Sequence, residues 1–452
     1  MNKTFSYRWL ARAPLGALIY SLALNSLAFT KGADISWITE MESAGSRFYD
    51  SNGTEKDVIQ ILKGKGMDAV RLRVWVNPAN GWNNLDDTIN KARRAKAAGM
   101  RIMIDFHYSD SWADPGQQTK PAAWKNYSFE QLMAAVYQHT QNSLLLLQSA
   151  GITPEWVQVG NETNNGMLWE EGRASANMRN FAWLVNSGYD ATKAVFPNAK
   201  VIVHIANCFD NGLFRWIFDG LNNNGGKWDI IGASNYPTVA PNRTWQQANS
   251  QCLSNLNDMV SRYQRDVMIA EIGVPWDHAQ GKDIIADMIS KMRQVSSGRG
   301  QGVFYWEPQA YNWQGYGLGA WNPNTRRPAA SLDAFLEGAL PSKTILVRAL
   351  GKAGKESLSL RINGTNIATW TLSTSMQSYS VKTTASGPLT VNFTNDQGNY
   401  DVQVDYIQVD GTTYQAEAQS INTGVWQNNA CGGGSGKSEW LHCNGYIGFG
   451  NF

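Results

Sequence analysis

The chain has 452 residues, more than one domain usually contains, so length alone predicts two domains. Its hydrophobic content of 43% is enough for sizeable cores. A net charge of +2, with no long basic run, argues against a general nucleic-acid binder. The count of 19 tryptophans is high, and indole rings offer flat apolar faces on which sugar rings stack. Composition therefore indicates a neutral partner, with carbohydrate as the class that the tryptophans suit.

Residues 1–28 predict a secretory signal peptide. Basic residues come first, an apolar stretch occupies residues 15–27, and residues 26–28 fit the small-residue rule for cleavage. A single-pass membrane anchor is the alternative, but Asn25 and several small residues shorten the apolar run. We therefore expect a protein that is exported to the extracellular space.

Short apolar strands alternate with helical segments between residues 29 and 340. Eight such repeats in this span fit a (β/α)8 barrel better than an open sheet. The expected strands are 33–37, 69–76, 101–106, 156–159, 201–204, 230–234, 267–271 and 302–306. The expected helices include 85–98, 129–149, 244–263 and 282–295, and Ser128 with Gln131 predicts a capping box at the second of them.

Two glutamates, Glu162 and Glu271, follow the fourth and end the seventh of these expected strands. A carboxylate at the end of a buried strand is costly unless it has partners or chemical work to do. Either glutamate alone is better explained by a structural ion pair, since such pairs are common. Both together, at the same face of a barrel, match what the hydrolysis of a glycosidic bond requires.

Other polar residues collect at the same ends of the expected strands. Arg71 and Arg73 alternate along the second strand and so point the same way, with Arg73 nearer the functional end. Further candidates come from the third, fifth, sixth and eighth strands: His107, His204, Asn235, Tyr236, Trp306 and Glu307. Each is more often structural than catalytic, but together they predict a cleft.

Four segments resemble glycoside hydrolase family 53, the endo-β-1,4-galactanases. They are DFHYSDSWADPGQQTKP (105–121), GNETNNGMLW (160–169), AEIGVPW (270–276) and YWEPQAY (305–311). The resemblance covers residues 32 to about 340. It implies a secreted barrel enzyme in which Glu162 is the acid/base, Glu271 is the nucleophile and Asn161 contacts the sugar 2-hydroxyl.

We therefore expect a monomeric, secreted endo-β-1,4-galactanase that hydrolyses plant cell-wall (arabino)galactan with retention of configuration. Arg73 is expected to keep Glu271 ionised. The expected substrate-binding residues are Arg73, His107, Asn161, His204, Tyr236 and Trp306, with Trp82, Trp112, Trp313 and Trp321 as further candidates for sugar stacking. A related mannanase or xylanase, or a non-catalytic polysaccharide-binding protein, is the alternative. Some bacterial family members hold calcium in the seventh and eighth loops, where Asp277 and His278 fall, but no ligand set is assigned.

The composition changes after residue 340, where Thr, Ser, Val and Asn dominate. Short expected strands at 345–349, 358–362, 367–372, 389–394 and 402–409 predict a small all-β sandwich over residues 341–452. Cys431 and Cys443 flank a Gly-rich loop, which in an exported protein predicts a disulfide. A metal site with His442 is the alternative. Cys208 and Cys252 either pair with each other or stay buried as thiols.

The loop TNDQGNYDVQVDY places Asp396, Asp401 and Asp405 close together. Carboxylates in such a loop suit calcium, although a solvated acidic turn is an equal alternative. Residues 344–450 resemble carbohydrate-binding module family 60, a β-sandwich that uses calcium to contact sugar hydroxyls. The resemblance implies Glu356, Asp396 and Asp401 around the ligand-contacting calcium. Asp405 and Glu417 would hold a second, structural calcium.

Overall fold

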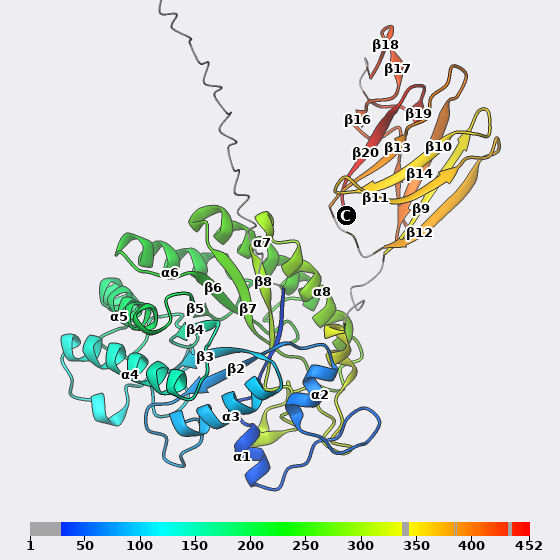
Figure 1. Cartoon of the computed structure of the whole chain (residues 1–452). Helices are drawn as coiled ribbons and strands as arrows, with labels where there is room; N and C mark the ends of the chain where they lie inside the picture. The colour runs from blue at the N-terminus through cyan, green and yellow to red at the C-terminus, as the bar shows by residue number, and fades with distance from the viewer. Residues whose placement is uncertain (1–28, 337–342, 384, 386, 433–435) are drawn as a thin grey trace, which may run out of the picture.

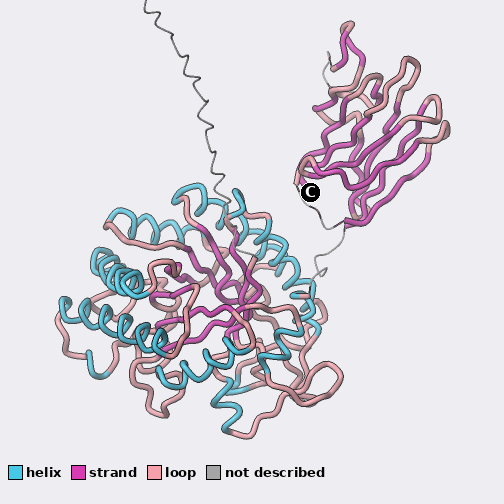
Figure 2. The backbone as a smooth tube through the Cα atoms, viewed as in Figure 1, coloured by secondary structure: helices cyan, strands magenta, loops and turns pink. Residues whose placement is uncertain are grey.

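The computed structural model describes residues 29–336, 343–383, 385, 387–432 and 436–452. Eight parallel strands close into a barrel ringed by helices, and antiparallel sheets follow in the chain (Figures 1 and 2). The expected (β/α)8 barrel followed by an all-β sandwich is confirmed. The expected signal peptide lies outside the described residues. Among the described helices, none combines the length and apolar character needed to cross a membrane.

The barrel strands pair in chain order, and the last strand pairs with the first to close the ring. The strands are β1 (Thr30–Asp34), β2 (Ala69–Val74), β3 (Arg101–Phe106), β4 (Trp156–Val159), β5 (Lys200–Ile205), β6 (Ile230–Asn235), β7 (Asp266–Ile272) and β8 (Gly300–Trp306). The helices are α1 (Ile38–Ser43), α2 (Val58–Gly64), α3 (Leu85–Ala97), α4 (Phe129–Ser149), α5 (Ala174–Val195), α6 (Asn211–Asn223), α7 (Trp245–Tyr263) and α8 (Gly281–Arg293).

Local sequence signals set several of these boundaries. The predicted capping box is present at the start of α4, where Ser128 and Gln131 satisfy each other's backbone N–H groups. Gly66, Gly99 and Gly151 follow α2, α3 and α4 with φ of 84°, 72° and 74°. Glycine takes this left-handed conformation without steric cost, so each residue ends its helix and redirects the chain toward the next strand.

The first strand is shifted from its predicted position, because β1 ends at Asp34 and Trp37 lies beyond it. The Asp34 carboxylate accepts hydrogen bonds from the backbone N–H and the hydroxyl of Ser36, at 2.9 and 2.6 Å. This turn takes the chain out of the sheet. It leaves the indole of Trp37 at the rim of the barrel, where it becomes part of the cleft described below.

One apolar layer fills the barrel interior toward the N-terminal ends of the strands. Its members are Ala69, Met103, Trp156, Ile202, Ile230, Met268 and Phe304, one from each of seven strands. The remaining strand, β1, contributes Gly32, where a Cβ would lie only 2.3 Å from the Phe304 ring. Glycine therefore makes room for Phe304. The barrel is a packed core at this level, and its polar side chains lie above.

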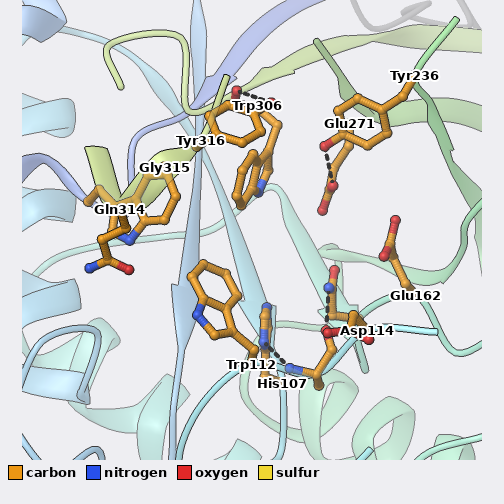
Figure 3. Close-up of a pocket in the computed structure, with 13 residues that line it drawn as sticks. His107, Trp112, Asp114, Glu162, Tyr236, Glu271, Trp306, Gln314, Gly315 and Tyr316 are labelled. Carbon is orange, nitrogen blue, oxygen red and sulfur yellow. Dashed lines mark hydrogen bonds between the residues drawn. The ribbon is translucent and has the colours of Figure 1, made fainter. Parts of the chain in front are cut away.

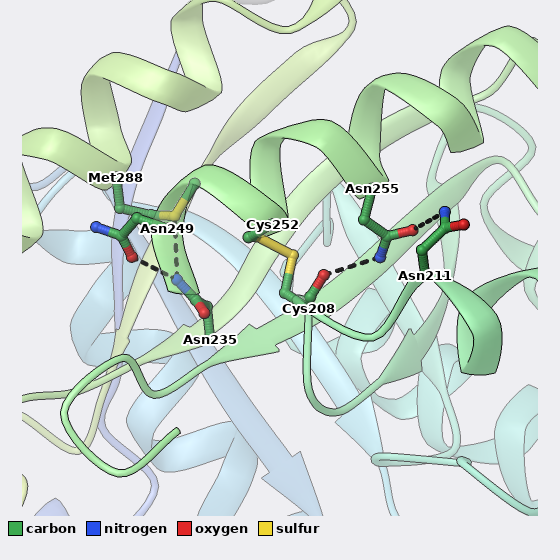
Figure 4. The surroundings of a disulfide bond; sticks show 7 residues. All are labelled: Cys208, Asn211, Asn235, Asn249, Cys252, Asn255 and Met288. Atoms are coloured by element: carbon green, nitrogen blue, oxygen red, sulfur yellow. Dashed lines mark hydrogen bonds between the residues drawn. A yellow bond between two sulfur atoms is a disulfide. The ribbon is translucent and has the colours of Figure 1, made fainter. Parts of the chain in front are cut away.

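The two cysteines that the sequence left open form a disulfide between the loop after β5 and helix α7 (Figure 4). Cys208 and Cys252 are both fully buried. The Cys208 carbonyl accepts a hydrogen bond from Asn255 Nδ2 at 2.9 Å, and its N–H donates to the Ser234 carbonyl at 2.9 Å. The disulfide therefore fixes this loop beside the C-terminal end of β6, which carries Ser234.

The C-terminal sheets enclose a separate apolar core, which includes Val347, Leu360, Val391 and Val404. One sheet has the order β11-β10-β13-β20-β16, and the other has the order β12-β9-β14-β15, with β19 also paired to β14. The bounds are β9 (Lys343–Gly351), β10 (Ser357–Ile362), β11 (Thr365–Thr371), β12 (Gln377–Thr383), β13 (Pro388–Phe393), β14 (Val402–Val409), β15 (Thr412–Gln415), β16 (Ile421–Asn422), β17 (Trp426–Gln427), β18 (Ala430–Cys431), β19 (Trp440–Leu441) and β20 (Gly445–Asn451). The predicted disulfide between Cys431 and Cys443 is confirmed.

Candidate active site

A polar layer lies directly above the apolar layer of the barrel. Side chains alternate along a strand, so the residue two positions after each inward apolar residue also points inward. At this level the strands β1 to β5 contribute Asp34, Arg71, Asp105, Gln158 and His204, each at most 1% exposed. Charged and amide groups so deeply buried must satisfy one another.

Arg71 makes contacts with most of the other residues in this polar layer. Its Nη1 lies 2.8 Å from Asp34 Oδ2 and 3.0 Å from Glu271 Oε1, and its Nη2 lies 2.9 Å from Asp105 Oδ2. Nη2 also donates to Asn161 Oδ1 at 2.8 Å, and Nε donates to Gln158 Oε1 at 3.1 Å. Burial alone would lower the pKa of Arg71, but the surrounding carboxylates raise it. The guanidinium is therefore a fixed positive charge under the carboxyl ends of the strands.

A register shift aims Glu271 at this charge. Met268 faces the barrel interior, so strict alternation would turn Glu271 outward. The pairing of β6 with β7 slips by one residue, so that Ala233 opposes Ile269 but Ser234 opposes Glu271. Such a bulge re-aims the side chains that follow it. Glu271 is 5% exposed, and its second oxygen accepts a hydrogen bond from the Tyr236 hydroxyl at 2.7 Å.

Glu162 lies just beyond β4 and has fewer donors. Its backbone takes a left-handed conformation, with φ of 43°. Its Oε1 accepts a hydrogen bond from the Ser234 hydroxyl at 2.6 Å, and Ser234 Oγ lies 2.8 Å from His204 Nε2. Burial lowers the pKa of His204 well below its usual value, so this imidazole is neutral. Ser234, itself in contact with His204, therefore holds the Glu162 carboxylate by a hydrogen bond, and neither residue places a positive charge beside it.

The two glutamates sit in unequal environments. Burial raises the pKa of Glu162 to about 6. Burial also raises the pKa of Glu271, and the nearby Glu162 adds to the shift, while Arg71 opposes it. Two coupled carboxyls in one site share a proton. Arg71 and the Tyr236 hydroxyl both oppose the rise at Glu271, because they stabilise its ionised form.

Both glutamates line a cleft of about 390 Å³ at the carboxyl ends of the strands (Figure 3). The lining residues are Trp37, His107, Trp112, Ala113, Asp114, Asn161, Glu162, Tyr236, Glu271, Trp306, Gln314, Gly315 and Tyr316. Figure 3 shows the carboxylates on one side of the cleft and the indoles of Trp112 and Trp306 on the other. This arrangement combines paired carboxylates with flat apolar faces, which suits a carbohydrate.

Four of the expected substrate-binding residues line the cleft: His107, Asn161, Tyr236 and Trp306. The ring of His107 is fixed, because Nδ1 accepts from Trp75 Nε1 and the Ala113 N–H at 3.2 and 3.3 Å. Its Nε2 therefore carries the proton that is directed at Asp105 Oδ2, 3.0 Å away. Of the further stacking candidates, Trp112 lines the cleft, whereas Trp82, Trp313 and Trp321 do not.

Two expectations need correction, because Arg73 and His204 lie behind the cleft wall. His204 is fully buried and Arg73 is 1% exposed, so neither is placed to contact a substrate directly. Arg73 also does not pair with Glu271. Its Nη1 lies 3.0 Å from Glu307 Oε1, and Arg71 occupies the position beside Glu271. The alternation along β2 was interpreted correctly, but the closure of the barrel puts Glu271 at the height of the first arginine.

The comparisons with known proteins agree with this geometry. A family model described as glycosyl hydrolase family 53 matches residues 30–346. This chain belongs to that family. The arabinogalactan endo-beta-1,4-galactanase of Thermothelomyces thermophilus is 34% identical over 302 residues, which cover 62% of this chain and 89% of the relative. The endo-beta-1,4-galactanase of Bacillus subtilis is 32% identical over 310 residues, which cover 62% of this chain and 70% of the relative.

Solved structures agree with the family assignment. A structure from work on two fungal β-1,4-galactanases is 32% identical, covers 68% of this chain and 99% of its own, and gives a TM-score of 0.62. A second family model, described as a Ca-dependent, xylan-binding carbohydrate-binding module of family CBM60, matches residues 344–423. A structure described as vCBM60 in complex with galactobiose is 61% identical over 24% of this chain and 99% of its own, with a TM-score of 0.24. The chain is therefore a family 53 glycosidase with a family 60 module.

The loops expected to hold calcium meet at one end of the sandwich, but their carboxylates are not gathered. The Lys352 N–H donates to the Asp401 carbonyl at 2.9 Å, which joins the loop before Glu356 to the loop that carries Asp396. The Glu356 carboxylate accepts from two backbone N–H groups, and Asp401 Oδ2 lies 2.9 Å from Lys352 Nζ. Within the described residues, no three acidic, His or Cys side chains form a metal-binding group. The donor chemistry fits calcium, whereas a ready-made cage is absent there.

The second expected calcium set is not supported by the contacts of its members. The Asp405 carboxylate pairs with Arg348 Nε at 3.1 Å, and Glu417 is exposed. The two residues are brought near each other only through the backbone, where the Ala416 N–H donates to the Asp405 carbonyl at 3.1 Å. Asp405 is held in an ion pair with Arg348, and the second calcium site stays a prediction. Among the described barrel residues, Asp277 and His278 likewise belong to no such group.

The Ser234 hydroxyl predicts a specific change in pH dependence. Its hydrogen bond stabilises ionised Glu162 and so lowers the pKa of that carboxyl. Ser234→Ala should therefore raise this pKa from about 6 and move the basic limb of the kcat/KM profile to higher pH, by roughly half to one unit. The measurement is a pH–rate profile, with Ser143→Ala on α4 as a matched control. A basic limb that stays in place or moves to lower pH would contradict the assigned contact.

Proposed function

We propose that the protein is an exported endo-β-1,4-galactanase that hydrolyses galactan with retention of configuration. The observation that carries the proposal is the pair Glu162 and Glu271, which line one cleft but have different partners. The galactanases among its family 53 relatives supply the substrate class. Two disulfides support export, because disulfides persist in oxidising compartments. The chain is proposed to act as a monomer on plant cell-wall polysaccharide.

In the proposed mechanism Glu271 is the nucleophile. Arg71 at 3.0 Å and the Tyr236 hydroxyl at 2.7 Å stabilise its negative charge and align the carboxylate before substrate binds. It attacks the anomeric carbon, while protonated Glu162 donates its proton to the departing glycosidic oxygen. Glu162, now ionised, then accepts a proton from a water molecule as this water attacks the anomeric carbon. The bond between the sugar and Glu271 breaks, and the sugar is released. Asn161 is held by Arg71 and by the Ala113 carbonyl, and it is proposed to contact the 2-hydroxyl of the bound sugar.

The carboxylate roles predict different defects in two variants. Glu271→Ala should abolish turnover of galactan, and added azide should restore some activity by yielding a glycosyl azide of inverted configuration. Glu162→Gln should lose about 10²- to 10⁴-fold on galactan, the usual contribution of a general acid, but should still cleave aryl glycosides with good leaving groups. Initial rates and product analysis check both outcomes, with surface residue Glu130→Gln as the control.

The same assay distinguishes the proposed substrate from its alternatives. Reducing-sugar release should be measured with galactan, arabinogalactan, xylan and mannan side by side. The wild-type protein should act on the two galactans and leave xylan and mannan essentially uncut. Rates on xylan or mannan comparable to those on the galactans would contradict the proposal and indicate a related β-glycanase. If Glu271→Ala keeps a substantial fraction of activity, the nucleophile is misassigned.

For the C-terminal module we propose calcium-dependent binding of a β-linked polysaccharide. The description of its family supports calcium and xylan, and Glu356, Asp396 and Asp401 are the residues that would hold the ion. Calcium, when bound, supplies open coordination positions for sugar hydroxyls. The exposed Lys352 now pairs with Asp401, and such surface pairs contribute little to stability. Asp401 is therefore free to exchange this partner for a metal ion.

Affinity electrophoresis of the full chain in xylan gels tests this proposal, because a galactanase barrel should not bind xylan. Retardation should occur with calcium and disappear with EDTA. Asp401→Ala should remove retardation in calcium without unfolding the sandwich, whereas Glu439→Gln, which loses only a contact to Gln403, should retain it. Undiminished retardation in EDTA would exclude a calcium-bridged mode and favour stacking on aromatic rings.

A further inference from the structure

Arg73 has no role in the proposed reaction at Glu162 and Glu271, yet it is a buried charged residue. Its side chain is buried, and Nη1 donates to Glu307 Oε1 at 3.0 Å. Its Nε and Nη2 are also buried, yet neither has a hydrogen-bond partner among the described residues. Buried polar groups without partners are rare in native structures, and each such case needs an explanation.

Three indole rings surround the guanidinium in place of hydrogen-bond acceptors. The Arg73 Cζ lies 4.3 Å from the ring centroid of Trp112, 5.2 Å from that of Trp75 and 5.3 Å from that of Trp37. All three distances fall within the range of a cation–π interaction, which is stronger when the cation is desolvated. The rings also contact one another edge-on, with centroids 5.2 Å apart for Trp75 and Trp112 and 5.6 Å for Trp37 and Trp112.

Glu307 connects Arg73 to the backbone of Trp37, which carries one of the three surrounding indoles. Its two carboxylate oxygens accept hydrogen bonds from the Trp37 N–H at 3.1 and 3.2 Å, while Oε1 also receives Arg73 Nη1. Gln309 Nε2 donates to the other oxygen at 2.5 Å. One fully buried carboxylate therefore fixes both the cation and the residue that carries one of its indoles.

Two of the three indoles around Arg73 line the cleft, although Arg73 itself does not. Trp37 and Trp112 line the cleft, and Trp306 packs on both of them, so that the three indoles form an aromatic wall. In Figure 3 the indoles of Trp112 and Trp306 lie opposite the carboxylates. Arg73 lies behind this wall. A sugar hydroxyl could reach its free N–H groups only if the Trp112 ring, 4.3 Å away, moved aside.

We propose that Arg73, anchored by Glu307, is a positioning residue that holds the indoles of Trp37 and Trp112 as a sugar-stacking wall. It would thus strengthen substrate binding without touching the substrate. This inference rests on the proposed function of the cleft as a galactan-binding site. Arg73 pairs with Glu307 and not with Glu162 or Glu271, whereas Arg71 pairs with Glu271. Loss of Arg73 should therefore weaken substrate binding and spare the chemical step.

A double-mutant cycle tests the proposal on the full-length protein with galactan. Arg73→Met should raise KM about tenfold and leave kcat within about threefold, because a desolvated cation–π contact is lost from the wall. Trp112→Ala should raise KM as well, and adding Arg73→Met to it should raise KM by clearly less than tenfold, because Trp37 is then the only wall indole left for Arg73 to hold. Arg73→Lys keeps the charge but not the planar group, so it should fall between wild type and Arg73→Met.

Arg179→Met is the matched control, because it removes an arginine that lies 4.2 Å from the Trp183 ring on the outer surface. It should change neither KM nor kcat. Circular dichroism of the tryptophan bands gives a readout that needs no substrate. The signal of the coupled indoles should change in Arg73→Met and stay in Arg179→Met, even if the wild type fails on galactan and the proposed function is wrong.

Three results would overturn the inference. They are unchanged KM in Arg73→Met, a loss confined to kcat, or multiplicative effects of the two substitutions on KM. If Arg73→Met fails to fold, Arg73→Lys and Glu307→Gln decide in its place. Both preserve side-chain volume, and both should raise KM more than they lower kcat. If they instead lower kcat alone, Arg73 acts on the catalytic carboxylates.

Discussion

One buried charge organises the site: the guanidinium of Arg71 at the centre of the barrel. It forms ion pairs with Asp34, Asp105 and Glu271, and it also donates hydrogen bonds to the amide oxygens of Gln158 and Asn161. Removing one partner of such a network leaves an uncompensated buried charge, which is strongly destabilising. The same contacts that satisfy Arg71 therefore also fix the relative positions of side chains from five separate segments of the chain.

This constraint explains why two chemically identical glutamates can do different work. Glu271 shares the charge of Arg71 and receives the Tyr236 hydroxyl, so its ionised form is stabilised. Among the described residues, the Glu162 carboxylate accepts a hydrogen bond only from Ser234, whose neighbour His204 is neutral. Environment thus separates the proton affinities of the pair, as an acid and a nucleophile in one site require. The apolar layer below, where Phe304 rests on Gly32, gives this polar layer a rigid floor.

Much of the architecture could be predicted from the sequence because it follows from local patterns. Apolar strands, helix caps and positive-φ glycines indicated a (β/α)8 barrel, and Glu162 and Glu271 stood out as carboxylates at strand ends. The partner of Glu271 could not be predicted in this way. Arg71 and Arg73 point the same way, and which one meets Glu271 depends on the stagger of the closed barrel and on a bulge in β7.

Other features depend on contacts between distant segments. Trp37 was expected inside the first strand, but the hydrogen bonds of Asp34 to Ser36 move it to the cleft rim. The Asp-x-Ser spacing was a usable signal for that turn. The expected calcium ligands stay a prediction, and the pairing of Asp401 with Lys352 and of Asp405 with Arg348 had no local signature in the sequence.

The anomeric configuration of the first product tests the central claim that Glu271 acts as a nucleophile. Proton NMR of a galactan digest, recorded before the released sugar mutarotates, reports this configuration directly. Attack by Glu271 followed by attack of water predicts that the β anomer appears first and the α anomer only later. An α anomer as the initial product would mean a single displacement by water, and Glu271 would then be a base and not a nucleophile.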